Sequence, residues 1–104
     1  MSRRRIDELI DEATVDCYNE EEQHEGFLVM LDEHLACPVR ALVVGEDVTV
    51  LGFDRDPPGE VVARCRRGRR TYRVNATALE WRGAPPDGAE WIEAYAAWLR
   101  GGGG

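Results

Sequence analysis

The stretch VRALVVGEDVTVLGFDRDPPGEVVARCRRGRRTYRV, residues 39–74, decides the fold class. Short runs within it alternate apolar and polar side chains, the period of two that is typical of β-strands. Turn-forming residues separate these runs at Gly45-Glu46, Asp56–Gly59 and Arg67-Gly68. Strands are therefore predicted over residues 39–44, 48–54, 61–66 and 72–74. Because the connections are short, the strands should form an antiparallel meander.

The residues before this stretch follow a helical period. Apolar side chains recur at helical spacing along one face, at Ile6, Leu9, Ile10, Ala13 and Cys17. This spacing predicts an amphipathic helix of about four turns. Asn19 and Glu22 form a capping-box pattern, so a second helix is predicted to begin there and to stop before Pro38. Gly26 weakens this helix, and we expect either a bend or a start near Gly26. Its buried stripe would be Phe27, Met30, Leu31 and Leu35.

A third helix is predicted after the sheet. Asp87 and Glu90 resemble a second capping box, and an apolar face follows at Trp91, Ile92, Tyr95, Trp98 and Leu99. This face should pack on the sheet. Residues 1–100 are thus predicted to form a single α+β domain: two N-terminal helices, a small curled antiparallel sheet that could form an SH3-like barrel, and a C-terminal helix. The glycines at 101–104 are expected to form a flexible tail.

The charge of the chain restricts its partners. The 104 residues carry a formal net charge of -7, with eleven acids and only three arginines in residues 1–36. Such acidity favours cations or basic partners and makes nucleic-acid binding an unfavoured interpretation. All thirteen basic residues are arginine, so no Schiff-base or P-loop lysine is available. Three cysteines without a C-x-x-C pair, and no apolar leader or spanning run, predict a soluble cytoplasmic protein.

The strongest local signal is the acidic segment after the first helix. Its oxygen-bearing residues are Asp16, Asn19, Glu20, Glu21 and Glu22. Ca²⁺ takes six to eight hard oxygen ligands, which clustered carboxylates and amides supply. Adjacent glutamates also repel one another unless a cation neutralises them. The alternative is a solvated helix N-terminus, where acids are favoured by the helix dipole, and spacing alone favours this alternative.

A second acidic segment lies in the predicted turn at Asp54–Glu60. It begins like the D-x-D-x-x-G half of an EF-hand loop. Pro58 then stands at the fifth position and Cys65 at the twelfth, where oxygen ligands are required, so it is not an EF-hand. A looser calcium loop using Asp54, Asp56 and Glu60 remains open, beside the interpretation of a polar turn.

Three further signals are weaker. The arginines at 64, 66, 67, 69, 70 and 73 could meet phosphates, but internal pairing or exposure to solvent is the favoured interpretation. The cysteines and histidines show no second pair at zinc-finger spacing. The one serine, Ser2, lies at the start of the chain, and neither histidine accompanies a recognisable nucleophile motif. We therefore do not predict an enzyme.

Three stretches together resemble a known family: residues 13–23, residues 63–68, and residues 88–95 with Trp98. In this order they are similar to small acidic bacterial calcium-binding proteins first described in cyanobacteria, over roughly residues 6–99. The resemblance implies non-EF-hand calcium binding through surface carboxylates and a buffering or sequestering role. The alternative function is a protein interaction module that uses the acidic helical face and the arginine-rich hairpin.

Overall fold

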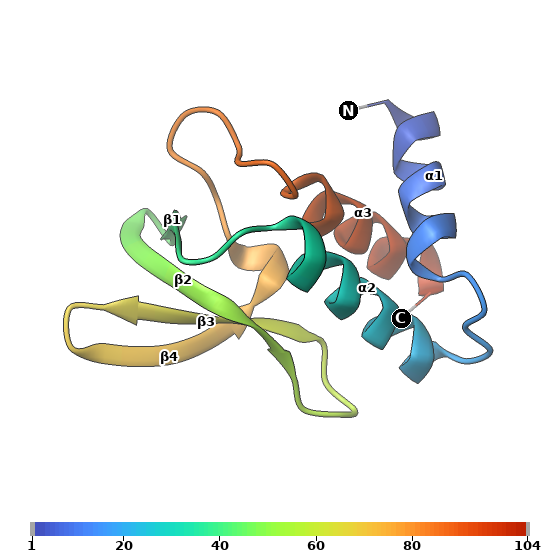
Figure 1. The fold of residues 1–104 in the computed structure, drawn as a ribbon, viewed down its shortest axis with the longest axis horizontal. Helices are drawn as coiled ribbons and strands as arrows, with labels where there is room; N and C mark the ends of the chain where they lie inside the picture. The colour runs from blue at the N-terminus through green and yellow to red at the C-terminus, as the bar shows by residue number, and fades with distance from the viewer. Residues whose placement is uncertain (1, 104) are drawn as a thin grey trace.

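The computed structural model, which describes residues 2–103, pairs its four strands in chain order (Figure 1). All neighbouring pairs are antiparallel, which confirms the predicted meander. The strands are β1 Val39–Val43, β2 Glu46–Arg55, β3 Val61–Arg67 and β4 Arg70–Asn75. A single bridge between Leu42 and Glu80 returns the chain to β1. Within the described residues β1 and β4 are not paired, so the sheet curls without closing into a barrel.

Three α-helices pack beside the sheet: α1 Arg3–Ala13, α2 Glu20–His34 and α3 Glu90–Trp98. Helix α2 contacts β2 and β3, whereas α1 packs against α2 and α3 on the side away from the sheet (Figure 1). A 3-10 turn, η1 Ala76–Ala78, follows β4, and a π-helical turn, η2 Leu99–Gly103, follows α3. The predicted glycine tail therefore overlaps η2, while residue 104 lies outside the described residues. No helix among residues 2–103 is both long enough and apolar enough to cross a membrane.

The first helix is shorter than predicted because the chain turns after Ala13. Asp16 adopts a positive φ of 60°, which a right-handed helix does not allow. Cys17 therefore lies in the connection to α2, and its thiol contacts the carbonyl of Glu22. The predicted cap of α2 is confirmed, since the Glu22 N–H donates to Asn19 Oδ1 over 2.9 Å.

Helix α2 passes through Gly26 without interruption, so a start near Gly26 is wrong. A Cβ at this position would lie 2.0 Å from the carbonyl oxygen of Ala13. Gly26 is therefore the point where the end of α1 packs against α2. This close approach explains a glycine in a helix interior, where it otherwise costs stability.

The predicted cap at Asp87 is also wrong. Helix α3 begins at Glu90, and its start has no side-chain cap; instead the Gly88 N–H donates to Glu90 Oε1 over 2.8 Å. Gly88 has a φ of 93°, and a Cβ there would lie 2.3 Å from the His34 carbonyl oxygen. The turn before α3 is thus shaped by packing on the end of α2.

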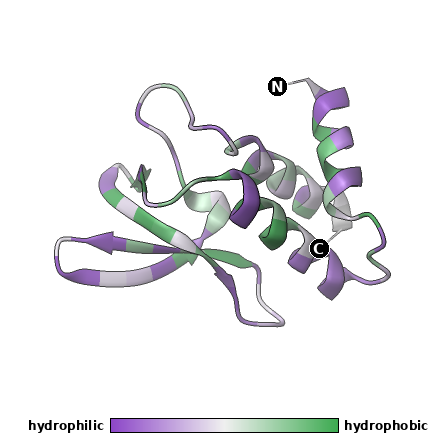
Figure 2. Ribbon diagram, viewed as in Figure 1, coloured by the Kyte–Doolittle hydropathy of each residue, from purple (hydrophilic) through white to green (hydrophobic). Residues whose placement is uncertain are grey.

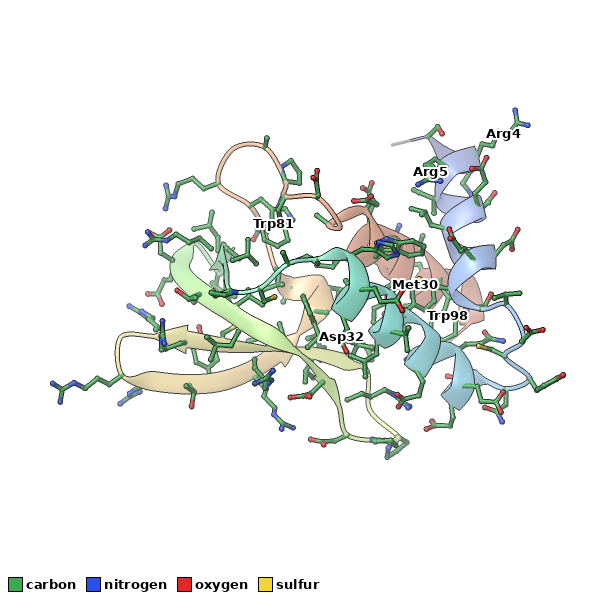
Figure 3. The ribbon with its side chains drawn as sticks, in the orientation of Figure 1. Arg4, Arg5, Met30, Asp32, Trp81 and Trp98 are labelled. Carbon is green, nitrogen blue, oxygen red and sulfur yellow. The ribbon has the colours of Figure 1, made fainter. Side chains whose placement is uncertain are left out.

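The core lies between the inner face of the sheet and the helices (Figure 2). In that view the middle of β2 and β3 is coloured hydrophobic, whereas the far end of the β3–β4 hairpin is hydrophilic. Helix α3 contributes Tyr95 and Trp98, the latter labelled in Figure 3. Trp98 Nε1 donates to Gln23 Oε1 over 3.0 Å, which fixes α3 against the first turns of α2.

Candidate functional site

A shallow, widely open acidic cleft of about 480 Å³ lies at the start of α2. The α1–α2 connection, the first turns of α2 and the β2–β3 turn form its walls. Its lining residues are Asp16, Cys17, Tyr18, Glu21, Glu22, Glu25, Arg55 and Pro57. Four carboxylates and one guanidinium give the lining a formal net charge of -3. We refer to this set of residues as the acidic cleft.

The cap of α2 positions the rim of the acidic cleft. The Tyr18 N–H donates to Glu22 Oε2 over 2.7 Å, and the Glu22 N–H donates to Asn19 Oδ1. These reciprocal bonds hold the connection against the helix, as in a capping box. Asn19 therefore orients the site through its cap, and one carboxylate oxygen of Glu22 is used by the backbone.

The guanidinium of Arg55 lies in the floor of the cleft, and its side chain is 1% exposed. Nη2 donates to Glu21 Oε2 over 2.8 Å, and Nη1 donates to Glu25 Oε1 over 3.0 Å. Nε donates to the Gly59 carbonyl over 2.6 Å. Burial disfavours the charged guanidinium, but hydrogen bonds and charges from the two glutamates outweigh it and raise the pKa of Arg55. Arg55 therefore links α2 to the β2–β3 turn as a permanent cation.

Sequence reasoning missed both Glu25 and Arg55. Glu25 follows Glu21 by four positions, so both lie on the same face of a helix. Arg55 falls on the buried face of β2 together with Phe53, and a buried charge needs partners. The spacing of the two glutamates and the arginine on a buried strand face could together have predicted a contact between α2 and the β2–β3 turn.

The second predicted acidic segment, Asp54–Glu60, does not contribute carboxylates to the acidic cleft. Asp54 accepts from Arg64 Nε over 2.7 Å and lies 3.9 Å from Arg73 Nη2. Arg73 Nη1 also pairs with Asp56. Successive side chains of a strand point to opposite faces, so Asp54 points away from the face of β2 that carries Arg55, while Asp56 follows the end of β2. Neither they nor Glu60 line the acidic cleft.

The arginine-rich hairpin is partly used within the molecule. Arg64 pairs with Asp54, Arg73 with Asp56, and Arg67 with Glu46. This confirms the internal use of three of the six arginines. The other three, at 66, 69 and 70, form no salt bridge with any carboxylate among residues 2–103.

Arg64 reaches Asp54 by crossing Gly52. A Cβ on Gly52 would lie 2.4 Å from Arg64 Nη2. Gly52 also stands where the pairing of β2 with β3 shifts register, and such irregularities re-aim side chains. Asp32 of α2, labelled in Figure 3, lies near the same group: burial, then the charge of Asp54, raise the pKa of Asp32.

A buried hydrogen-bond chain supports the inner side of α2. His24 Nδ1 lies 2.6 Å from Tyr95 Oη, which accepts from the Val61 N–H over 3.0 Å. His24 Nε2 lies 3.9 Å from Glu20 Oε1. Burial, followed by the charge of Arg55, lowers the pKa of His24. Burial also raises the pKa of Tyr95 to about 12, so both groups are neutral near pH 7.

The donor chemistry of the acidic cleft fits Ca²⁺, because Asp16, Glu21, Glu22 and Glu25 provide hard carboxylate oxygens. Within residues 2–103, however, no group of three or more histidine, cysteine or acidic side chains is already gathered at metal-binding distance. A cation in the cleft would therefore have to draw the carboxylates together.

Two solved structures share the fold of this chain. The structure of the chain is similar to the crystal structure of Anabaena CcbP, with a TM-score of 0.79, 21% identity, and coverage of 95% of this chain and 92% of that one. It is also similar to a calcium binding protein in the calcium-binding form, with a TM-score of 0.78, 20% identity and 98% coverage of both chains. No curated protein is similar enough in sequence to count as a match.

The family comparison covers most of the chain. The profile of the CcbP family, described as calcium binding, matches residues 5–99. The chain therefore belongs to the CcbP family of calcium-binding proteins.

Proposed function

We propose that the protein binds Ca²⁺ in the acidic cleft, with carboxylate oxygens from Asp16, Glu21, Glu22 and Glu25. The observation that carries this proposal is that four carboxylates line one cleft with a single arginine to neutralise them. Bound Ca²⁺ would supply the missing positive charge. Membership of the family supports the choice of ion. Magnesium should compete poorly, because it demands a stricter octahedron and loses water reluctantly.

A buffering or sequestering role follows from the exposure of the ligands. The side chains of Glu21 and Glu25 are 52% and 49% exposed. Exposed carboxylates that must be drawn together place a site toward the weak end of the calcium range, which suits a buffer better than a trigger. The three cysteines are free, which fits a reducing compartment. We place this buffer in the cytoplasm.

The other predicted ligands have secondary parts in this proposal. Asn19 and Glu20 flank the cleft, and Asn19 supports it through the cap of α2. Asp54, Asp56 and Glu60 would form a separate, weaker site, because an ion there must displace Arg64 and Arg73 from the aspartates. Binding at two sites of different strength is the expected pattern.

Isothermal titration calorimetry of the chelator-stripped protein with CaCl₂, repeated in excess MgCl₂ at physiological salt, tests the proposal. The decisive variant changes Glu20, Glu21 and Glu22 to glutamine together. Its matched control changes Glu8 to glutamine, Asp11 to asparagine and Glu12 to glutamine, which removes the same three charges from α1. We expect the first variant to bind calcium at least about tenfold more weakly, and the control to stay within about threefold of the wild type.

The outcomes separate the two acidic segments. Equal weakening in both variants would mean that only the overall charge matters, and the cleft assignment would be wrong. Unchanged binding in the first variant, with loss in an Asp54→Asn/Asp56→Asn variant, would move the ion to the β2–β3 turn. No saturable heat from the wild type, with no NMR shifts between residues 16 and 25, would reject calcium binding by this chain.

A protein interaction remains the second candidate function. Tyr18 at the rim of the cleft is 89% exposed. The hairpin arginines at 66, 69 and 70 are exposed as well. Capture of a partner that is lost at moderate salt but is indifferent to a chelator would favour this function.

A further inference from the structure

The floor of the proposed calcium site already contains a cation. Arg55 places both of its terminal nitrogens on the glutamates that face the cleft, at 2.8 and 3.0 Å. The guanidinium is almost fully removed from water, whereas the glutamates are about half exposed. These carboxylates are therefore held from the protein side by an arginine and are open on the other side to ions from solution.

We infer that Arg55 is an internal counter-cation that competes with calcium for Glu21 and Glu25, and that it thereby sets the calcium affinity of the acidic cleft. This inference rests on the calcium site proposed above. In the metal-free protein Arg55 supplies the charge that calcium supplies when bound. It is a positioning residue, since it acts on the ion only through the two glutamates.

Electrostatics determine the direction of this effect. A divalent ion that binds the outer oxygens of Glu21 and Glu25 lies close to the buried guanidinium, and the two like charges repel each other. An ion that takes the inner oxygens must displace the guanidinium itself. In both cases Arg55 opposes the ion. A buried arginine deprived of its carboxylates is also costly, because an uncompensated buried charge is left behind.

A further hydrogen bond of Arg55 links ion binding to the fold. Arg55 also donates to the carbonyl of Gly59 in the β2–β3 turn over 2.6 Å. The guanidinium thus joins the start of α2 to this turn. Calcium that shares or takes the glutamates weakens the link, and by thermodynamic reciprocity the link weakens calcium binding.

The test compares Arg55→Met with Arg69→Met by calcium calorimetry at physiological salt. Arg69 is exposed in the β3–β4 turn and has no salt bridge among the described residues, so its variant controls for the change in net charge and side chain. We expect Arg55→Met to bind calcium at least about tenfold more tightly than the wild type, and Arg69→Met to stay within about twofold. Arg55→Lys, which keeps the charge, should stay near the wild type.

A second readout distinguishes this role from a purely structural one. Without calcium, Arg55→Met should unfold at a lower temperature than the wild type, because two glutamates lose their counter-charge. Calcium should restore more stability to this variant than to the wild type. In the wild type itself, NMR should show faster exchange of the Arg55 Nη protons upon calcium saturation. That measurement decides the question if Arg55→Met does not fold.

Failure of the inference and failure of the proposed function look different. Calcium binding by the wild type, with equal or weaker binding by a folded Arg55→Met, would overturn the role of Arg55 and leave the site intact. Unchanged exchange of the Nη protons at calcium saturation would do the same. Binding by Arg55→Met alone would support the inference in its strongest form. Absence of binding by both proteins would overturn both proposals.

Discussion

At Gly26, the absence of a side chain determines how two helices meet. The carbonyl oxygen of Ala13 occupies the place that a Cβ would take, at 2.0 Å. The connection that begins after Ala13 carries Asp16 and Tyr18 to the rim of the acidic cleft. Because Gly26 has no Cβ, the end of α1 can pack closely on α2, and this packing positions one wall of the candidate site.

Gly26→Ala should lower the free energy of unfolding by about 1–3 kcal/mol, because the added methyl group forces α1 and α2 apart. Alanine is otherwise the better helix former, so the sign of the effect separates packing from propensity. Urea unfolding measures it. Gly101→Ala is the control, since a Cβ there meets nothing within 4 Å. Stabilisation by Gly26→Ala would contradict the packing.

His24 should make the stability fall as the solution is acidified. Burial, then the charge of Arg55, lower the pKa of His24 below its ordinary value of 6.5, while Glu20, Glu21 and Glu60 oppose this shift. The unfolded chain therefore binds a proton that the folded chain does not, and stability decreases as the pH falls below about 6.5. Above that pH this contribution is fully present.

His24→Asn tests this expectation, because the amide oxygen can still accept a hydrogen bond from Tyr95 but does not titrate. Urea unfolding at pH 7.5 and pH 5.5 should show a smaller loss of stability on acidification for the variant than for the wild type. Equal losses would mean that His24 does not contribute. A larger loss in the variant would reverse the sign of the argument.

At the scale of the element, the start of α2 has two features: a side-chain cap that holds the helix, and glutamates that line the acidic cleft. Three glutamates occupy its first turn, where the helix dipole favours negative charge. The solvated N-terminus and the calcium site are therefore compatible interpretations of one segment. The cap holds the turn, and the carboxylates beyond it face the cleft.

Asn19→Ala should lower the free energy of unfolding by about 1 kcal/mol, because it removes the acceptor of the Glu22 N–H. Asn75→Ala is the matched control, since Asn75 precedes η1 without a side-chain cap bond. Thermal or urea unfolding is the measurement. Equal losses at the two asparagines would show that the cap of α2 is not formed in solution.

At the scale of the whole molecule, charge is distributed unevenly. The net charge of -7 is concentrated before residue 37, and the arginines of the hairpin satisfy acids on β2. The acidic cleft thus keeps an excess of negative charge that the rest of the fold does not neutralise. Such a surface attracts cations in a manner that depends on salt.

Calcium should therefore stabilise the whole domain. At a free concentration about 100 times the dissociation constant, a single site adds about 2.7 kcal/mol to the free energy of unfolding. A thermal scan with CaCl₂ should show a higher midpoint, a chelator should reverse it, and MgCl₂ at equal concentration should give a smaller rise. Identical rises with both ions would point to screening of the net charge instead of a calcium site.

The sequence by itself determined the order of the three α-helices and four strands, the meander, the cap at Asn19 and the acidic segment at the start of α2. Periodicity and capping depend on residues within one or two helical turns of each other, so they can be detected from the amino-acid sequence alone. It also determined the family, since the motifs stand in order along the chain. It did not determine the uninterrupted course of α2 through Gly26 or the start of α3, because these depend on the packing of Gly26 on α1 and of Gly88 on the end of α2.

Only the tertiary structure decided which acids share a site. Glu21 and Glu25 meet Arg55 across 34 and 30 residues of sequence, and no local pattern encodes a pairing over that separation. Asp54 is separated from the cleft because successive side chains of a strand face opposite ways, and Asp56 pairs with Arg73 of β4. The composition thus specified how much negative charge the molecule carries, while packing of α2 on the β2–β3 turn determined where that charge stays available for an ion.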